Sequence, residues 1–212
     1  ARFTISNMGV EMGAKFCIIP ADKTTLNWVK GSNAVRKPNP QYADPDAKYT
    51  MVKEYDAAKF VPQAAKPHTV DNNASVPDIE GTHIDEAYLG TCTNGRLEDL
   101  EIAAKIIKNK KVNKNVRFIV APASRSIYLE AVDKGIISTF IKAGASVVTP
   151  GCGPCVGTHN GVPSIGETVI SSANRNFKGR MGQPEAFIYL GSPATVVASA
   201  IEGKITDPRK FL

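Results

Sequence analysis

No apolar run in this sequence approaches the roughly 20 residues that a membrane-spanning helix needs, so we exclude a transmembrane helix. The N-terminus, Ala1-Arg2-Phe3-Thr4, lacks an initiator Met and shows neither the charged start nor the apolar stretch of a signal peptide. We therefore expect a cytoplasmic protein. We also interpret the 212 residues as a processed or truncated piece of a longer polypeptide.

The sequence also lacks a concentrated block of one charge. Its net charge is +6, but the lysines are scattered, and the one small cluster is typical of a solvated helix end (Lys108, Lys110, Lys111 and Lys114). Nucleic-acid-binding domains usually gather their basic residues on one face, so we expect neither a nucleic acid nor a membrane as partner. A mildly positive surface suits an anionic small-molecule substrate equally well.

Cysteine is scarce, with four residues in the chain: Cys17, Cys92, Cys152 and Cys155. Their number would allow two disulfides, but nothing marks the chain as secreted, and metal binding or catalysis is therefore favoured. Cys17 lies in the apolar run Phe16-Cys17-Ile18-Ile19, which is typical of a small buried hydrophobic residue.

The organisation changes near Pro77. We predict that residues 1–66 are the C-terminal part of a preceding α/β domain, with a helix from about Ser6, a strand at 16–19 and a helix starting at 21–25. Residues 67–80 are predicted to be a linker. Proline blocks helix interiors and removes hydrogen-bond donors, so the region from Pro38 to Pro77 should be mostly irregular.

Residues 81–212 alternate between strand and helix patterns. Strands are predicted at 84–89, 116–120, 145–148, 168–171 and 186–190, and helices at 97–108, 124–134, 136–143 and 193–200. Such alternation predicts an α/β fold, a three-layer α/β/α arrangement with a mostly parallel sheet.

Two cysteine segments directly follow predicted strands. The first strand runs into Gly90-Thr91-Cys92-Thr93-Asn94-Gly95, and the third into Thr149-Pro150-Gly151-Cys152-Gly153-Pro154-Cys155. Ligands of open α/β sheets bind beyond the carboxyl ends of the strands, where a parallel sheet brings both loops to one edge. Each loop also precedes a predicted helix N-terminus, which stabilises thiolate. Three thiolates are therefore expected to converge.

Three interpretations compete for these cysteines. Cys-Gly-Pro-Cys is also the dithiol of thioredoxin-like proteins, but that reading leaves Cys92 without a role. A structural zinc site would need Cys17 as its fourth ligand. An iron–sulfur cluster held by three cysteines leaves one iron open, which suits a Lewis-acid catalyst.

The motifs resemble those of the aconitase superfamily. Tyr88 to Arg96 and Gly151 to Gly157 are similar to its two cysteine signatures, Asn174 to Arg180 to a third diagnostic stretch, and Thr4 to Glu11 to a fourth. They occur in the family order across nearly the whole chain. Phe177-Lys178-Gly179-Arg180-Met181-Gly182 most resembles large subunits of the 3-isopropylmalate dehydratase and homoaconitase branch.

The resemblance implies a role for each matching position. Cys92, Cys152 and Cys155 match the ligands of a 4Fe-4S cluster in which one iron has no protein ligand. Asn174 and Arg175 match a pair beside the cluster and substrate, and Arg180 matches the arginine that holds a substrate carboxylate. The active-site positions of the fourth stretch correspond to Asn7 and Glu11.

The resemblance further implies a hydro-lyase that interconverts 2- and 3-isopropylmalate by dehydration and rehydration in leucine biosynthesis. The family's first catalytic His and Asp residues, and the serine base of its swivelling domain, have no counterpart here. We therefore expect the N-terminal half of the large subunit and a small subunit as partners, with a di- or tricarboxylate as substrate. The alternatives are a homoaconitase or aconitase acting on a tricarboxylate, and a non-catalytic iron–sulfur or RNA-binding module.

Overall fold

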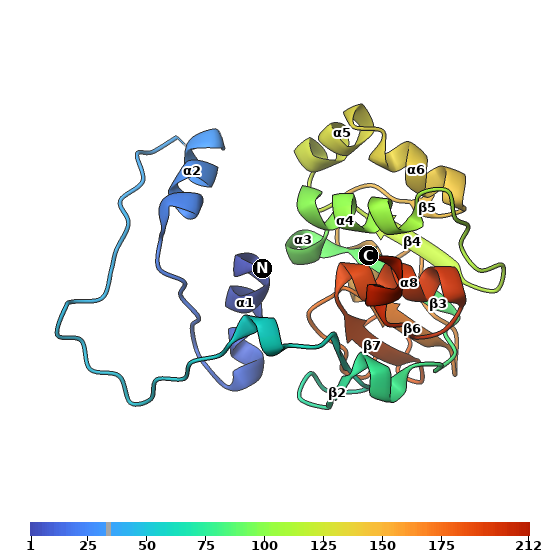
Figure 1. The fold of residues 1–212 in the computed structure, drawn as a ribbon, viewed down its shortest axis with the longest axis horizontal. Coiled ribbons are helices and arrows are strands. Elements are labelled where there is room, and N and C mark those ends of the chain that lie inside the picture. The colour runs from blue at the N-terminus through green and yellow to red at the C-terminus, as the bar shows by residue number, and fades with distance from the viewer. Residues whose placement is uncertain (33–34) are drawn as a thin grey trace. The chain divides into compact units, whose positions relative to one another are not determined.

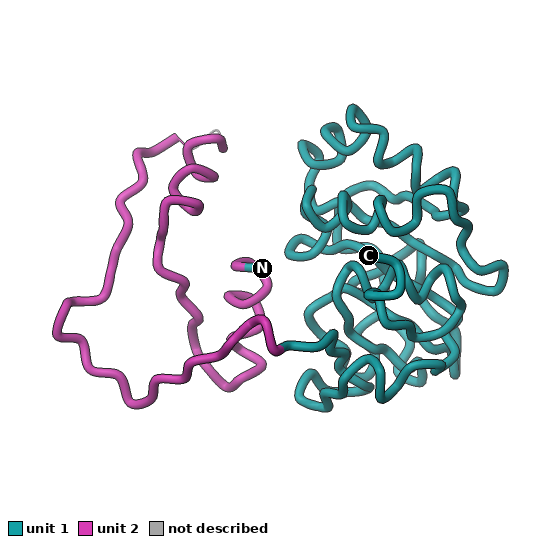
Figure 2. The backbone as a smooth tube through the Cα atoms, in the orientation of Figure 1, with its two compact units in different colours: residues 1, 60–212 teal, residues 2–59 magenta. Residues whose placement is uncertain are grey.

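The computed structural model describes residues 1–32 and 35–212. The chain forms two compact units, residues 2–59 and residues 60–212 together with Ala1 (Figure 2). None of the helices in the described ranges combines the length and the apolar character that crossing a bilayer requires.

The larger unit is built on a seven-stranded sheet with the order β2-β1-β7-β6-β3-β4-β5 (Figure 1). Strands β3 to β7 pair in parallel, whereas β1 is antiparallel to both β7 and β2. This confirms the predicted α/β class with a mostly parallel sheet. The strands are β1 (Gln63–Ala65), β2 (Asn73–Ser75), β3 (Glu86–Gly90), β4 (Arg117–Ala121), β5 (Ser146–Val147), β6 (Thr168–Ser171) and β7 (Phe187–Gly191).

Helices follow the strands where the sequence places caps. The Oγ atom of Ser124 accepts a hydrogen bond from Ile127 N at 3.3 Å, and that of Ser192 accepts one from Thr195 N at 3.1 Å. Each bond satisfies a backbone N–H that has no partner inside the helix. The helices of this unit are α3 (Thr91–Asn94), α4 (Leu97–Ile107), α5 (Arg125–Asp133), α6 (Ile136–Ala143), α7 (Gly153–Val156) and α8 (Pro193–Glu202), with short 3₁₀ helices η3 (Val76–Ile79) and η4 (Pro208–Phe211).

The two faces of the sheet are covered differently. Helices α4, α5, α6 and α8 contribute to one apolar core, which includes Ala87 and Leu89 of β3. The opposite core contains Tyr88 of β3 and Met181, with Cys155 packed against it. Successive side chains of a strand point to opposite faces, which places Tyr88 on the face away from the long helices. That face is covered by connecting segments, and these carry the chemistry.

The smaller unit contains α1 (Arg2–Met8), η1 (Gly9–Met12), α2 (Lys23–Gly31) and η2 (Ala57–Lys59). The predicted helix near residues 21–25 is confirmed, and Asp22 caps it by accepting from Thr25 N at 2.9 Å. The predicted strand at residues 16–19 is wrong. A strand requires a paired neighbour, and this segment has none in the described chain. The side chains of Phe16 and Ile18 are accordingly 83% and 84% exposed.

The proline-rich region is only partly irregular. Residues 60–80 pack with the larger unit, and β1 and β2 lie inside the expected irregular stretch. Both are three-residue strands, and their existence depends on the pairing of Ala64 with Gly191 and of Ala64 with Ala74. Strands this short carry too little periodicity to be recognised from the sequence.

Candidate metal centre

The two cysteine segments leave the sheet at one edge. Strand β3 ends at Gly90, which pairs with Ala121 of β4, and Val120 of β4 pairs in turn with Val147 of β5. Because these strands are parallel and in register, their carboxyl ends lie together. Cys92 follows β3 in the single turn of α3, and Cys152 and Cys155 follow β5, at the N-cap and inside the single turn of α7.

All four thiols are free in the described structure. Cys92 and Cys152 are exposed and Cys155 is half-buried, so all three predicted ligands are at least partly accessible to solvent. Cys17 is also half-buried, and it belongs to the smaller unit. It is therefore less enclosed than its apolar neighbours in the sequence suggest.

The pKa of Tyr88, a residue of β3, is affected by the three predicted ligands. Its side chain is fully buried, and burial raises the pKa of the Tyr88 phenol, with further contributions from negative charge on Cys155, Cys152 and Cys92. The parallel pairing of β3, β4 and β5 places the three cysteines in segments that leave the sheet beyond the carboxyl ends of β3 and β5.

No group of three His, Cys, Asp or Glu side chains among the described residues lies close enough to hold a single metal ion. A 4Fe-4S cluster is a larger body, and each thiolate binds a different iron.

Arg180 contacts one of the three predicted ligands, Cys155. Its Nη2 atom donates to Sγ of Cys155 at 3.2 Å, and its guanidinium carbon lies 5.6 Å from the ring centroid of Phe177. Its Nε atom is buried without a hydrogen-bond partner in the described chain. A guanidinium presents five N–H donors, so Arg180 keeps donors for a further ligand while it is held against Cys155.

Two glycines bring the Arg180 segment to the second cysteine segment. A Cβ atom on Gly157 would lie 2.2 Å from the backbone nitrogen of Gly182, a distance that real side chains do not reach. Both residues also have positive φ, +71° and +96°, where L residues are strained. The two motifs that contain them therefore pack backbone against backbone, and this contact places Arg180 beside Cys155.

Asn174 is attached to the first cysteine segment. It is buried, and its Oδ1 atom accepts from Thr93 Oγ1 and from Asn94 Nδ2, each at 3.1 Å. Asn94 Nδ2 also donates to the carbonyl oxygen of Ser172 at 2.7 Å. These bonds connect the end of β6 with the turn that carries Cys92. Arg175, the next residue, is half-buried.

The structure therefore brings four of the six predicted residues of the larger unit into two contact groups. Asn174 joins the turn of Cys92, and Arg180 joins Cys155. Asn7 is the next-to-last residue of helix α1, and Glu11 is an exposed residue of η1. Both belong to the smaller unit, and their part in the site is a proposal.

Glu86, the first residue of β3, is a buried ionisable residue that the sequence patterns do not reveal. Its side chain is fully buried, and Oε2 accepts from Nη2 of Arg117 at 3.0 Å and from Nε at 3.3 Å. Burial raises the pKa of Glu86 to about 7, and Arg117 opposes this increase. The available signal was an acidic residue at the start of an otherwise apolar strand. Tyr88 lies at the start of the first cysteine motif, which gives no indication of a separate role, although a phenol in a buried strand needs a hydrogen-bond partner.

The histidines stand apart from the thiols, with one exception. The ring of His159 packs on Gly153, where a Cβ atom would lie 2.8 Å from Cε1. His83 is exposed, and its Nε2 lies 3.0 Å from Oδ1 of Asp85. His68 is half-buried, and its ring lies 5.7 Å from that of Phe187.

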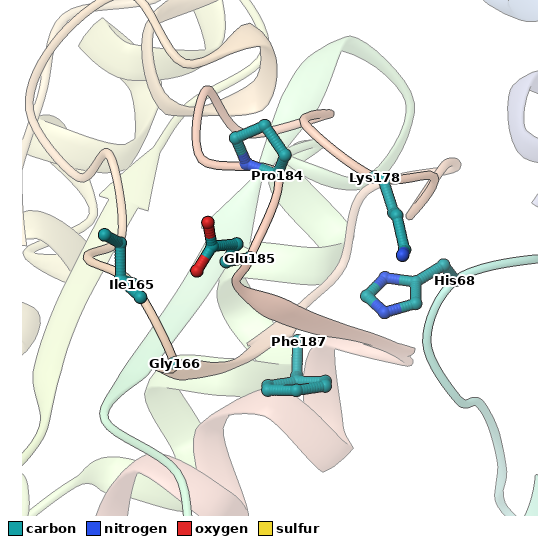
Figure 3. A pocket seen from close by; sticks show the side chains of 7 residues that line it. All are labelled: His68, Ile165, Gly166, Lys178, Pro184, Glu185 and Phe187. Carbon is teal, nitrogen blue, oxygen red and sulfur yellow. The ribbon is translucent and has the colours of Figure 1, made fainter.

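His68 borders a cavity of about 350 Å³, in which Lys178 extends toward the imidazole (Figure 3). The cavity contains none of the predicted ligand or substrate residues. Its lining consists of His68, Ile165, Gly166, Lys178, Pro184, Glu185 and Phe187.

Comparison with known proteins gives an independent result. The family described as "Aconitase family (aconitate hydratase)" matches residues 1–80 and 76–203. A "Probable methanogen homoaconitase large subunit" of Methanosarcina mazei is 54% identical over 99% of this chain and 53% of its own length. The "3-isopropylmalate dehydratase large subunit 2" of Archaeoglobus fulgidus is 52% identical over 100% of this chain and 51% of its own length.

The "3-isopropylmalate dehydratase large subunit 1" of Thermotoga maritima is 51% identical over 100% of this chain, again with 51% of its own length covered. The chain thus spans about half the length of these curated relatives.

Proposed function

We propose that this chain, which belongs to the aconitase family, is part of a cytoplasmic hydro-lyase that interconverts 2- and 3-isopropylmalate by dehydration and rehydration in leucine biosynthesis. Relatives named 3-isopropylmalate dehydratase large subunit support this activity across the whole chain. The observation that carries the proposal is the position of three free thiols in two segments that leave one edge of the sheet, with Arg180 bonded to one of them.

The proposed cofactor is a 4Fe-4S cluster held by Cys92, Cys152 and Cys155, with one iron left without a protein ligand. The donor set fits: the three thiols are free, lie at one edge of the sheet, and are accompanied by the unpartnered Tyr88 hydroxyl within the described chain. When bound, the cluster supplies an open Lewis-acid iron that makes the substrate hydroxyl a better leaving group.

The chain's own residues are proposed to bind and orient the substrate. Arg180 holds a carboxylate with donors that its bond to Cys155 leaves available, and a planar guanidinium matches the two oxygens of a carboxylate. Asn174 and Arg175 complete the substrate site. Asn174 is already held by Thr93 and Asn94, so its side chain is positioned before substrate arrives.

Asn7 and Glu11 are the proposed catalytic residues of the smaller unit. Their contribution requires residues 1–66 to include the C-terminal part of a preceding α/β domain that supplies the rest of the site. Residues 60–80, which contain the predicted linker 67–80, belong to the same unit as the cluster-binding domain, residues 81–212. The remaining half of the large subunit and a small subunit with a swivelling domain are the proposed partners. A base from the small subunit would remove the substrate's α-proton, a step that needs a pKa matched to the working pH.

A second candidate substrate is a tricarboxylate. The 54% identity to a protein named homoaconitase large subunit favours this alternative as strongly as the dehydratase names favour isopropylmalate. Both substrates carry at least two carboxylates, so Arg180 and Arg175 can bind either one.

The test uses the naturally encoded protein with its small subunit, reconstituted anaerobically with iron and sulfide. We expect the wild type to hold the cluster and to turn over 3-isopropylmalate faster than tricarboxylate analogues. Cys92→Ser should lose iron and activity together, whereas Cys17→Ser, the matched control in the smaller unit, should retain both. Equal iron content in the two variants would contradict the ligand assignment. Cluster binding without turnover of any hydroxy acid would favour the non-catalytic module.

A further inference from the structure

The hydroxyl of Tyr88 is a buried polar atom with an unexplained environment. The side chain is 0% exposed, and within the described residues the hydroxyl has no hydrogen-bond partner. Buried tyrosine hydroxyls normally find a partner, because leaving one without a hydrogen bond is unfavourable. A phenylalanine would fill the same apolar space without this cost.

The surroundings of Tyr88 indicate where the missing partner lies. The ring packs in the apolar core that includes Ile119 and Met181, and none of these side chains accepts a hydrogen bond. Cys155 packs against the same core. The charged groups that act on the hydroxyl are, in order of strength, Cys155, Cys152 and Cys92, followed by Glu86. The unpartnered hydroxyl and the Cys155 side chain therefore belong to the same side of the sheet and border one core.

We propose that the Tyr88 hydroxyl donates a hydrogen bond to a sulfur atom of the iron–sulfur group held by Cys92, Cys152 and Cys155, and so acts as a positioning residue that tunes this group. The proposal rests on the proposed function above. Hydrogen bonds to the sulfurs are among the factors that set the reduction potential of such groups. Partners beyond the direct ligands also affect how firmly a metal is held.

A donor aimed at sulfur stabilises the reduced form, in which the sulfur carries more negative charge. Removing the donor should lower the reduction potential and make oxidative loss of iron faster. In the metal-free protein the same change removes an unpartnered buried hydroxyl, and it should leave thermal stability unchanged or increase it. If Tyr88 only fills space in the core, removing its hydroxyl should have the same effect on the stability of the iron-loaded and of the metal-free protein.

The experiment compares Tyr88→Phe with Tyr189→Phe in the naturally encoded protein with its small subunit, reconstituted with iron and sulfide. Tyr189 is a matched control because it packs against the opposite core of the same sheet. Iron and sulfide content, the reduction midpoint and the rate of iron loss in air are measured, together with the Tm of the metal-free proteins.

For Tyr88→Phe we expect a roughly tenfold change in the reduction equilibrium, equivalent to about 59 mV downward for a one-electron couple. Iron loss should be faster in air, while the metal-free Tm does not fall. Tyr189→Phe should match the wild type in midpoint and in iron loss.

An unchanged midpoint and iron-loss rate in an iron-loaded Tyr88→Phe protein would overturn the role of Tyr88 and leave the proposed function intact. A wild type that binds no iron and sulfide would overturn both.

Discussion

Nη2 of Arg180 donates a hydrogen bond to Sγ of Cys155 at a distance of 3.2 Å. The two residues come from different motifs, 25 positions apart in the sequence. Their contact means that a residue predicted to hold substrate is fixed against a residue predicted to hold the cofactor. Charge-assisted bonds of this kind are among the stronger hydrogen bonds in proteins.

Replacing Arg180 with Lys should separate substrate binding from cluster binding. Lysine keeps the charge but loses the planar pair of donors, and a hydrogen bond to a charged group contributes about 1.5–3 kcal/mol. We expect kcat/KM to fall roughly ten- to a hundred-fold, with iron and sulfide content unchanged. Lys178→Ala, two residues away and exposed, is the control and should retain activity. Full activity in Arg180→Lys would remove Arg180 from the substrate site.

Gly157→Ala should disrupt the contact between the second cysteine segment and the Arg180 segment. The new Cβ would lie 2.2 Å from Gly182 N, so the backbones must separate. Gly166→Ala is a matched control, because Gly166 has a similar φ of +77° but open space around its Cβ position.

The control measures the strain of positive φ alone, about 1–2 kcal/mol. We expect Gly157→Ala to cost clearly more in urea unfolding and also to reduce iron binding. Equal costs in the two variants would show that the close approach of Gly157 and Gly182 has no energetic weight.

Asn174→Ala should loosen the turn that carries Cys92. The substitution removes the acceptor that Thr93 and Asn94 share, and each hydrogen bond lost contributes about 0.5–1.5 kcal/mol. Urea unfolding of the metal-free protein measures this loss. Asn72→Ala removes an exposed amide that donates to the Pro67 carbonyl, and it should cost much less. A smaller effect at Asn174 than at Asn72 would contradict the proposed support of the turn.

Glu86 should make stability depend on pH. Burial raises its pKa from 4.5 to about 7, so the folded state binds a proton more tightly than the unfolded state. The resulting stability is present below pH 4.5 and is lost as the pH rises to about 7. The free energy of unfolding should therefore fall by about 2–3 kcal/mol between roughly pH 5 and 8 through this residue.

Glu86→Gln should flatten that decline in urea titrations at successive pH values. Glu167→Gln is the control, because Arg117 lowers the pKa of Glu167 and confines its contribution to more acidic solutions. A wild type and a Glu86→Gln variant with parallel pH profiles would show that Glu86 stays ionised in the folded protein.

Much of this protein is determined by local sequence. The alternation of strand and helix patterns after Pro77, the caps Ser124 and Ser192, and the position of the cysteines directly after strands all depend on neighbouring residues. Side-chain periodicity and capping act over a few positions, so they can be identified without knowledge of the fold. The expectation that both cysteine segments leave one edge then followed from parallel strand order alone.

Tertiary structure decided the rest. The absence of a strand at residues 16–19 and the presence of the short strands β1 and β2 depend on which segments find a pairing partner. The bond from Arg180 to Cys155, the contact of Gly157 with Gly182 and the packing of Cys155 against the core of Tyr88 join segments that are distant in the chain. No local pattern encodes such distances, because they result from the packing of whole strands and loops into one unit.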